Sequence, residues 1–216
     1  MKELFERLYA FRLANQTADV DLYGAESIMK QSPSKDPKQQ RFELLIALML
    51  SSQTHDKLTS ATMTKIRHLL TPAKLLECQD LEDLLKPVSF YRTKAKNIKL
   101  MCSNLGIEQD IPNTLEELQN IKGVGPKMAL LAMQIGFGQC LGISVDTHVH
   151  RVAARLGWSS GKTPEVTRRE LEDKFPEHLW NKVNWTLVGF GQTVCKAKKP
   201  QCQSCPISDA CPKIGA

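Results

Sequence analysis

Four cysteines in the C-terminal part of the chain have the spacing of a metal site. Cys195, Cys202, Cys205 and Cys211 place four thiols within 17 residues of a 216-residue sequence. The N-terminal residues are charged and amphipathic and carry no secretory signal, so the clustered cysteines indicate metal binding rather than disulfides. Four thiolates bind either one structural zinc ion or an iron–sulfur cluster, and the spacing alone leaves both open.

The loop between the first two cysteines is basic. It has the sequence KAKKPQ and carries Lys196, Lys198 and Lys199. A 4Fe–4S cluster held by four thiolates has a net charge of roughly −2. Lysines beside such a cluster restore a surface that a phosphate backbone tolerates. These three lysines are therefore candidates for contacts with a phosphate backbone.

A second candidate site is the segment KGVGPK at 122–127. Two glycines one residue apart allow unusual backbone conformations and close approach of a ligand, and a helix opens at the proline. The amides of Gly123, Val124 and Gly125, together with the side chain of Lys122, would form a phosphate site. Such a helix–hairpin–helix holds a DNA backbone without reading its sequence. A plain helix–helix turn is the alternative, because G-x-G alone is a weak signal.

Lys127 and Asp146 are the candidate catalytic pair. Lys127 stands one residue into the second helix, where the helix dipole and burial would both favour a neutral, nucleophilic amine. A solvated lysine that contacts phosphate is the alternative, and the hairpin alone favours it. Asp146 precedes an amphipathic helix in the segment SVDTHVHRV and is expected to cap that helix. A capping carboxylate can also stabilise positive charge on a sugar or relay a proton, so it could serve the lysine as an acid partner.

These residues are expected on an all-helical scaffold. Residues 42–50 (FELLIALML) are apolar on every side and predict a helix inside a core. One apolar face predicts another helix, with Asp56 as its N-cap; the face comprises Leu58, Ala61, Ile66, Leu69 and Leu70. Residues 30–41 contain no strongly apolar side chain and predict a loop.

The composition narrows the class of protein. Lys and Arg outnumber Asp and Glu by 29 to 23, a formal charge of +6, which permits a polyanionic partner without requiring one. No apolar run approaches the ~20 residues that a membrane helix needs. We therefore expect neither membrane insertion nor secretion.

With these motifs together, the chain resembles the endonuclease III family over about residues 42–211. The resemblance is closest to eukaryotic members, although the chain starts near the expected start of the domain, without their usual N-terminal extension. It rests on the C-x6-C-x2-C-x5-C tail and on four motifs: LSSQT at 50–54, SFYRTKAKN at 89–97, KGVGPKMA at 122–129 and VDTHVHRV at 145–152.

The resemblance implies two helical domains with an active-site cleft between them. A six-helix domain containing the hairpin would span residues 35–140. Residues 1–34 and 141–216 would form a helical domain around a 4Fe–4S cluster. Lys127 would face Asp146 across the cleft.

The same resemblance implies roles for two further residues. Gln53 would fill the gap left by a flipped nucleotide, and Phe90 would wedge into the opposite strand. Ser89 stands where the family pattern has glycine, so the resemblance does not predict the shape of the turn at Phe90.

The function implied is that of a bifunctional DNA N-glycosylase and β-elimination lyase. It would remove oxidised pyrimidines such as thymine glycol from double-stranded DNA, and cleave abasic sites, as a monomer in the nucleus or the mitochondrion. A monofunctional adenine or mismatch glycosylase of the same fold is one alternative, but those relatives lack the lysine at position 127. A non-catalytic iron–sulfur DNA-binding module would leave Asp146 unexplained, and an electron carrier would leave the hairpin unexplained.

Overall fold

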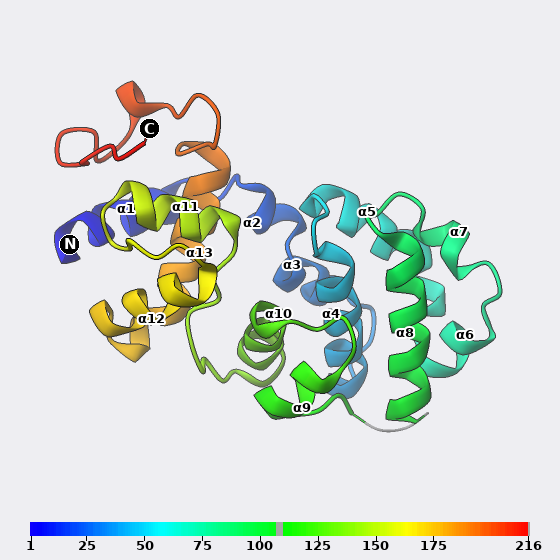
Figure 1. The fold of residues 1–216 in the computed structure, drawn as a ribbon. Coiled ribbons are helices and arrows are strands. Elements are labelled where there is room, and N and C mark those ends of the chain that lie inside the picture. The colour runs from blue at the N-terminus through cyan, green and yellow to red at the C-terminus, as the bar shows by residue number, and fades with distance from the viewer. Residues whose placement is uncertain (107–109, 216) are drawn as a thin grey trace. The chain divides into compact units, whose positions relative to one another are not determined.

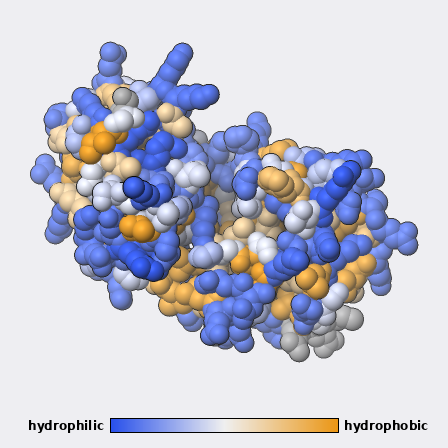
Figure 2. All heavy atoms as spheres, in the orientation of Figure 1, coloured by the Kyte–Doolittle hydropathy of each residue, from blue (hydrophilic) through white to orange (hydrophobic). Residues whose placement is uncertain are grey.

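The computed structural model describes residues 1–106 and 110–215. The described residues form helices and connecting turns and contain no β-strand, as the sequence predicts. None of the helices in these ranges is long and apolar enough to cross a membrane. On the face drawn in Figure 2, hydrophilic residues cover most of the surface and hydrophobic residues reach it in separate patches.

The chain divides into two compact units, each with its own core. The central unit comprises residues 22–139, and the terminal unit comprises residues 1–21 and 140–216. The expected boundary at residue 34 thus differs from the observed division. The reason is that Ile28 on helix α3 (Ala25–Lys30) is buried in the core of the central unit.

Helix α4 (Pro37–Ser51) organises the central unit. It packs against α3, α5, α8 and α10, and its residues 42–50 are all buried, which confirms the predicted core helix (Figure 1). The other helices of this unit are α5 (Asp56–Ile66), η1 (Arg67–Leu69), α6 (Pro72–Glu77), α7 (Leu81–Leu85), α8 (Tyr91–Leu105), α9 (Leu115–Asn120), α10 (Pro126–Leu131) and the π-helical turn η2 (Ala132–Gly136).

Three sequence predictions in this unit differ in part from the structure. The predicted loop at 30–41 ends early, because Asp36 caps α4 by accepting a hydrogen bond from the amide of Lys38. Of the apolar face predicted around α5, Ile66 and Leu70 are buried as expected, but Leu58 and Ala61 face solvent, and Thr59, Thr62 and Met63 are buried. The N-cap of α5 is His55, one residue before the predicted Asp56.

The terminal unit joins the two ends of the chain. Helix α1 (Lys2–Ala14) packs against α13 (Trp180–Thr193), which also packs against α11 (Thr147–Arg155) (Figure 1). The remaining helices are α2 (Asp19–Tyr23), which reaches the division between the units, α12 (Pro164–Lys174), η3 (Glu177–Leu179) and η4 (Cys202–Ser204).

A buried arginine fastens α1 in the terminal unit. The Arg12 side chain is fully buried, donates to both carboxylate oxygens of Asp21 at 2.7 and 2.9 Å, and lies over the ring of Trp185. A Cβ atom at Gly189 would lie 2.1 Å from the Arg12 guanidinium, so α13 needs glycine there. Breaking a buried pair of this kind is strongly destabilising, because it leaves an uncompensated charge.

Candidate functional site

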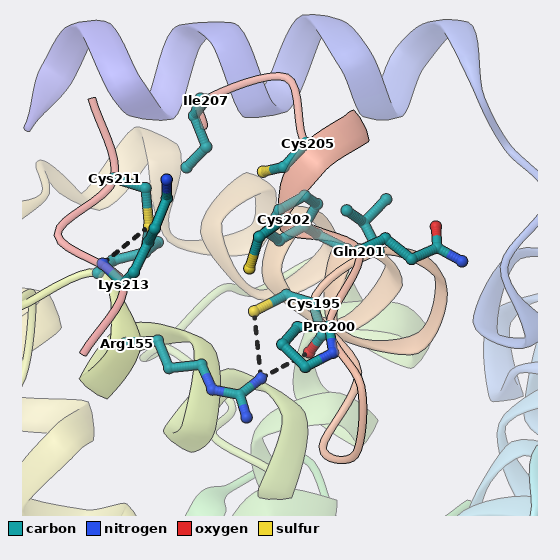
Figure 3. Close-up of a pocket in the computed structure, with 12 residues that line it drawn as sticks. Arg155, Cys195, Pro200, Gln201, Cys202, Cys205, Ile207, Cys211 and Lys213 are labelled. Carbon is teal, nitrogen blue, oxygen red and sulfur yellow. Dashed lines mark hydrogen bonds between the residues drawn. The ribbon is translucent and has the colours of Figure 1, made fainter. Parts of the chain in front are cut away.

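The four predicted cysteine ligands come together in the terminal unit. All four line one pocket, and Figure 3 shows their sulfur atoms pointing into it. Within the described ranges, no group of three His, Cys, Asp or Glu side chains stands close enough to hold a single metal ion. A zinc ion needs all four sulfurs at about 2.3 Å from one centre. Among the described residues, the four cysteines are the only His, Cys, Asp or Glu residues that line the pocket, and four thiolates, each bound to a different iron, are the ligand set of a 4Fe–4S cluster.

Two hydrogen-bond donors, one from a side chain and one from the backbone, are directed at these sulfurs. Arg155 Nη1 lies 3.5 Å from Cys195 Sγ, and the amide of Lys213 lies 3.4 Å from Cys211 Sγ (Figure 3). Donors of this kind stabilise thiolates and the negative charge of a cluster. Burial, together with the other three cysteines of the site, raises the pKa of the Cys205 thiol, and metal coordination reverses that preference by binding the thiolate.

The arginines at this site were missed in the sequence. Arg151 Nη2 donates to the Cys195 carbonyl at 3.1 Å, and Arg155 Nη1 donates to the Lys196 carbonyl at 2.7 Å. Both side chains are i, i+4 neighbours on α11. In the sequence they stand beside the apolar positions of an amphipathic helix, where arginine side chains are ordinarily solvated. Nothing in that pattern indicates that they support the cysteine loop.

The predicted basic loop projects its lysines into solvent. Lys196, Lys198 and Lys199 are exposed, while the backbone beneath them is held by the hydrogen bonds from Arg155 to Lys196 and Ala197. The loop therefore presents positive charge from a fixed backbone, which is the arrangement that a phosphate contact requires.

Asp146 caps α11, as the sequence predicts. Its Oδ1 accepts hydrogen bonds from the amides of His148 and Val149, both at 2.8 Å. The carboxylate is half-buried, and the positive end of the nine-residue helix favours its negative charge. The structure therefore fixes both the position and the orientation of this carboxylate within the terminal unit.

The helix–hairpin–helix lies in the central unit. Thr114 caps α9 through the amide of Glu117, and the chain then turns through Lys122 and the two glycines into α10. Lys127 is the second residue of α10 and is half-buried. The hairpin thus sets this amine at the start of a helix, as predicted.

The residues of the turn differ from one another more than the motif suggested. Gly123 has a φ of +94°, and a Cβ there would lie 2.6 Å from Asn97 Nδ2, so glycine is required twice over. Gly125 has a φ of −93°, and a Cβ there would meet no atom within 4 Å, so its backbone does not require glycine. Val124 is buried, and its amide donates to the Ile121 carbonyl at 2.9 Å. This commits the Val124 amide to the turn rather than to a phosphate.

Gln53 and Phe90 share an unusual backbone conformation. Both are exposed residues with positive φ, 52° for Gln53 and 58° for Phe90, although neither is glycine. Phe90 is 63% exposed. A left-handed, exposed phenylalanine gains little from folding and costs backbone strain, so its position points to a role outside the core.

Two family models match the chain. The model of the HhH-GPD superfamily of base excision DNA repair proteins matches residues 46–177, and that of the iron–sulfur binding domain of endonuclease III matches residues 195–211. The helical fold, the hairpin and the four-cysteine pocket therefore define an iron–sulfur DNA repair protein of the HhH-GPD superfamily.

The chain belongs to the endonuclease III family within that superfamily. Endonuclease III-like protein 1 of Mus musculus is 46% identical over 206 residues, which cover 92% of this chain and 68% of that protein. The protein of the same name from Gallus gallus is 43% identical over 218 residues, covering 98% and 76%. Endonuclease III of Thermotoga maritima is 36% identical over 193 residues, covering 87% and 90%.

Solved structures agree with this assignment. The structure of a trapped endonuclease III–DNA covalent intermediate matches with a TM-score of 0.81 and 28% identity, over 98% of this chain and 95% of that one. A non-covalent endonuclease III–DNA complex matches with a TM-score of 0.82. The protein is thus a DNA-binding glycosylase and abasic-site lyase of base excision repair that carries a 4Fe–4S cluster.

Proposed function

We propose that the protein is a bifunctional glycosylase for oxidised pyrimidines, such as thymine glycol, in double-stranded DNA, with Lys127 as its nucleophile. The observation that carries the proposal is the half-buried Lys127 at the second position of α10, which follows the glycine turn. A related solved structure is a trapped covalent complex with DNA, which accords with an enzyme that attacks its substrate. The substrate class rests on the family resemblance.

The chemistry follows from a primary amine that can form a covalent bond to the sugar. The damaged nucleotide is flipped out of the duplex, at a cost that is lower where the lesion weakens stacking. The Lys127 amine attacks C1′ of the sugar, the glycosidic bond breaks, and the base leaves with the electron pair and takes up a proton. The C1′–O4′ bond then breaks as the amine loses a proton and O4′ gains one, which opens the sugar ring and leaves a protonated imine at C1′. This imine acidifies C2′, and loss of a C2′ proton expels the 3′ phosphate by β-elimination.

Asp146 supplies the negative charge that this reaction needs. Positive charge develops on the sugar as the base leaves, and a carboxylate held in place stabilises it without reorganising. The two amide hydrogen bonds on Oδ1 fix the Asp146 side chain in one orientation. A carboxylate is also suited to carry protons between the lysine, the base and C2′.

Duplex DNA would be held by its backbone at two sites. Lys122 and the glycine turn would contact phosphates at the hairpin, and Lys196, Lys198 and Lys199 would contact them from the basic loop. Bound by the four cysteines, the cluster supplies structural stability to that loop. Gln53 and Phe90 would enter the duplex at the flipped nucleotide and at the opposite strand.

We propose that the protein acts as a monomer on damaged and abasic DNA in the nucleus or the mitochondrion. Each unit has its own hydrophobic core, so neither depends on a second copy to bury its apolar residues. The relatives with similar sequences include animal proteins, and two Arabidopsis thaliana homologues are named chloroplastic, so organelles also contain enzymes of this family.

Borohydride trapping on a thymine-glycol duplex tests the nucleophile and the substrate class together. Borohydride reduces the imine to a stable bond, so the wild-type protein should become covalently linked to DNA. Lys127→Gln should lose this product while duplex binding is retained. A variant that traps at the wild-type rate would show that another amine is the nucleophile.

Lys122→Gln is the matched comparison on the same hairpin. It removes a lysine that we assign to phosphate, so trapping should require more DNA but reach the wild-type rate at saturation. An undamaged duplex should give no trapped product. Trapping on abasic DNA without trapping on thymine glycol would support a lyase and contradict the proposed base specificity.

A further inference from the structure

A buried lysine lies beneath the turn that carries Gln53. Lys94 on α8 is 7% exposed, in a helix whose other lysines, Lys96 and Lys99, are exposed or half-buried. Its ammonium donates to the carbonyls of Leu50 and Ser52, both at 2.7 Å, and to Thr54 Oγ1 at 3.0 Å. All three protons of the ammonium are therefore used within one five-residue segment.

This segment includes the last two residues of α4 and the turn that follows the helix. The last carbonyls of a helix have no partner within it, and the negative end of the helix dipole favours a cation there. The Leu50 carbonyl is one of these groups, and Lys94 satisfies it. The bond to the Ser52 carbonyl holds the peptide that leads into Gln53, the residue with the positive φ.

Thr54 joins this segment to the turn that carries Phe90. Its hydroxyl accepts from Lys94 Nζ and from the amide of Ser89 at 3.1 Å, and it donates to the Ser52 carbonyl at 3.2 Å. One proton and two lone pairs are thus all engaged. Ser89 directly precedes Phe90, whose own carbonyl accepts from the amide of Lys94 at 3.0 Å.

We propose that Lys94 is a positioning residue that fixes the Gln53 turn and the Phe90 turn to each other, so that both side chains enter the duplex as one rigid unit. This inference rests on the proposed function, in which these two side chains enter DNA. Two exposed residues in left-handed conformations persist only where the surrounding structure holds them. The Lys94–Thr54–Ser89 connection is such a restraint on both turns.

Rigid placement matters because insertion must coincide with flipping of the damaged nucleotide. If the turns move independently, the two side chains must be ordered during binding, and poorly placed groups lose roughly 10- to 100-fold in rate. A purely structural lysine would instead affect stability and leave DNA distortion by the folded protein unchanged.

The test uses a duplex with 2-aminopurine opposite a tetrahydrofuran abasic analogue, which undergoes no β-elimination. Fluorescence rises when the base opposite the analogue is unstacked, so the signal reports insertion without chemistry. We expect a rise with the wild-type protein, and loss of it with Phe90→Ala at saturating protein. Lys94→Met keeps the aliphatic length, removes the ammonium, and should lower the rise to the level of Phe90→Ala. The double variant Lys94→Met, Phe90→Ala should give the same fluorescence as Phe90→Ala alone, because both changes prevent the same insertion into the duplex.

Two further variants keep the result interpretable. Thr54→Val keeps the side-chain shape but removes the oxygen that joins the two turns, so it should reproduce the Lys94→Met loss even if Lys94→Met folds poorly. Lys99→Met is the matched control, because Lys99 lies on the same helix and also donates to a carbonyl, that of Cys78 at 2.6 Å. It should give the wild-type rise.

The outcomes separate this inference from the proposed function. A full rise with folded Lys94→Met and Thr54→Val, but not with Phe90→Ala, would overturn the positioning role and leave insertion by Phe90 standing. A full rise with Phe90→Ala would overturn insertion by Phe90 and the positioning role with it. Neither outcome changes the expected loss of borohydride trapping in Lys127→Gln.

Discussion

Arg155 and Cys195 are joined at the end of α11 opposite to Asp146. Arg155 Nη1 lies 3.5 Å from the Cys195 sulfur, and the same guanidinium binds the carbonyls of the two residues that follow. Helix α11 thus carries the capping carboxylate at its first turn and the support of a cluster ligand at its last. The position of Asp146 and the integrity of the cysteine site depend on the same helix.

Replacing Arg155 with methionine should loosen the cluster and the basic loop. The change removes the donor from the part-buried carbonyls of Lys196 and Ala197, at about 0.5–1.5 kcal/mol for each hydrogen bond. Unfolding should therefore occur at lower urea concentration, and the visible absorbance of the cluster should decay faster under oxygen. Arg169→Met provides the control, because Arg169 forms an exposed ion pair with Glu165 worth less than about 1 kcal/mol. Equal stability and cluster lifetime in both variants would contradict the role given to Arg155.

Neutralising two lysines of the basic loop should reduce the salt dependence of DNA binding. Each phosphate contact contributes about −0.9 to the log–log slope, so Lys198→Gln with Lys199→Asn should flatten it by up to ~2. Asparagine suits position 199, where φ is 54°. A salt titration of duplex affinity gives the slope. The control is Lys30→Gln with Arg169→Gln, which removes the same amount of positive charge from two ion-paired residues. This control variant should keep the wild-type slope. An unchanged slope in the loop variant would place the loop away from DNA.

The two hairpin glycines should respond differently to alanine. Gly123→Ala meets both a positive φ and Asn97, so it should destabilise the protein by about 1–3 kcal/mol. Gly125→Ala meets neither, so its stability should change by less than about 1 kcal/mol. Its added methyl group should still weaken duplex binding, because it stands where backbone and phosphate approach. Wild-type affinity in Gly125→Ala would show that no phosphate lies against this residue.

The contribution of Lys94 to the free energy of unfolding should depend on pH in alkaline solution. Burial lowers the pKa of Lys94 from 10.5 to about 8. Between these values the unfolded chain holds more protons than the folded one, so the contribution of this group to the free energy of unfolding rises with pH. Urea midpoints of the wild type, measured relative to Lys94→Met, should increase from about pH 8 to about pH 10.5. A constant difference across this range would mean that the amine titrates normally in the folded state.

Local signals in the sequence predicted much of the fold. The apolar run at 42–50 became the core helix α4, and Asp146 became the cap of α11, since both depend on nearby residues. The buried face of α5 was predicted only in part, because Ile66 is buried as expected but Thr59 and Thr62 are buried in place of Leu58 and Ala61. Which face of a short helix is buried depends on neighbouring helices, and its own pattern was too weak to decide.

The supporting residues of the site depended on contacts between distant segments. Lys94 is separated by 40 to 44 residues from the oxygens it binds, and Arg155 by a similar distance from Cys195. A lysine in a helix is ordinarily solvated, so nothing in its own neighbourhood marks Lys94 as buried. Residue type and spacing identified the candidate chemical groups, whereas the residues that hold them in place appeared only in the structure.

The packing of α1 on α13 also sets an order for folding. Residues 1–21 leave the ribosome before the central unit does, but their partners on α13 lie more than 160 residues further along the chain, as the hydrogen bond from Trp185 to Asp21 illustrates. The central unit, residues 22–139, can bury its own core before α13 is made. Helix α1 must therefore wait, with the apolar face around Phe5 and Leu8 uncovered, until the last third of the chain emerges. Helix α1 is thus synthesised before its partners on α13 and is among the last of these helices to reach its final place, and in the meantime it is exposed to chaperones and to aggregation.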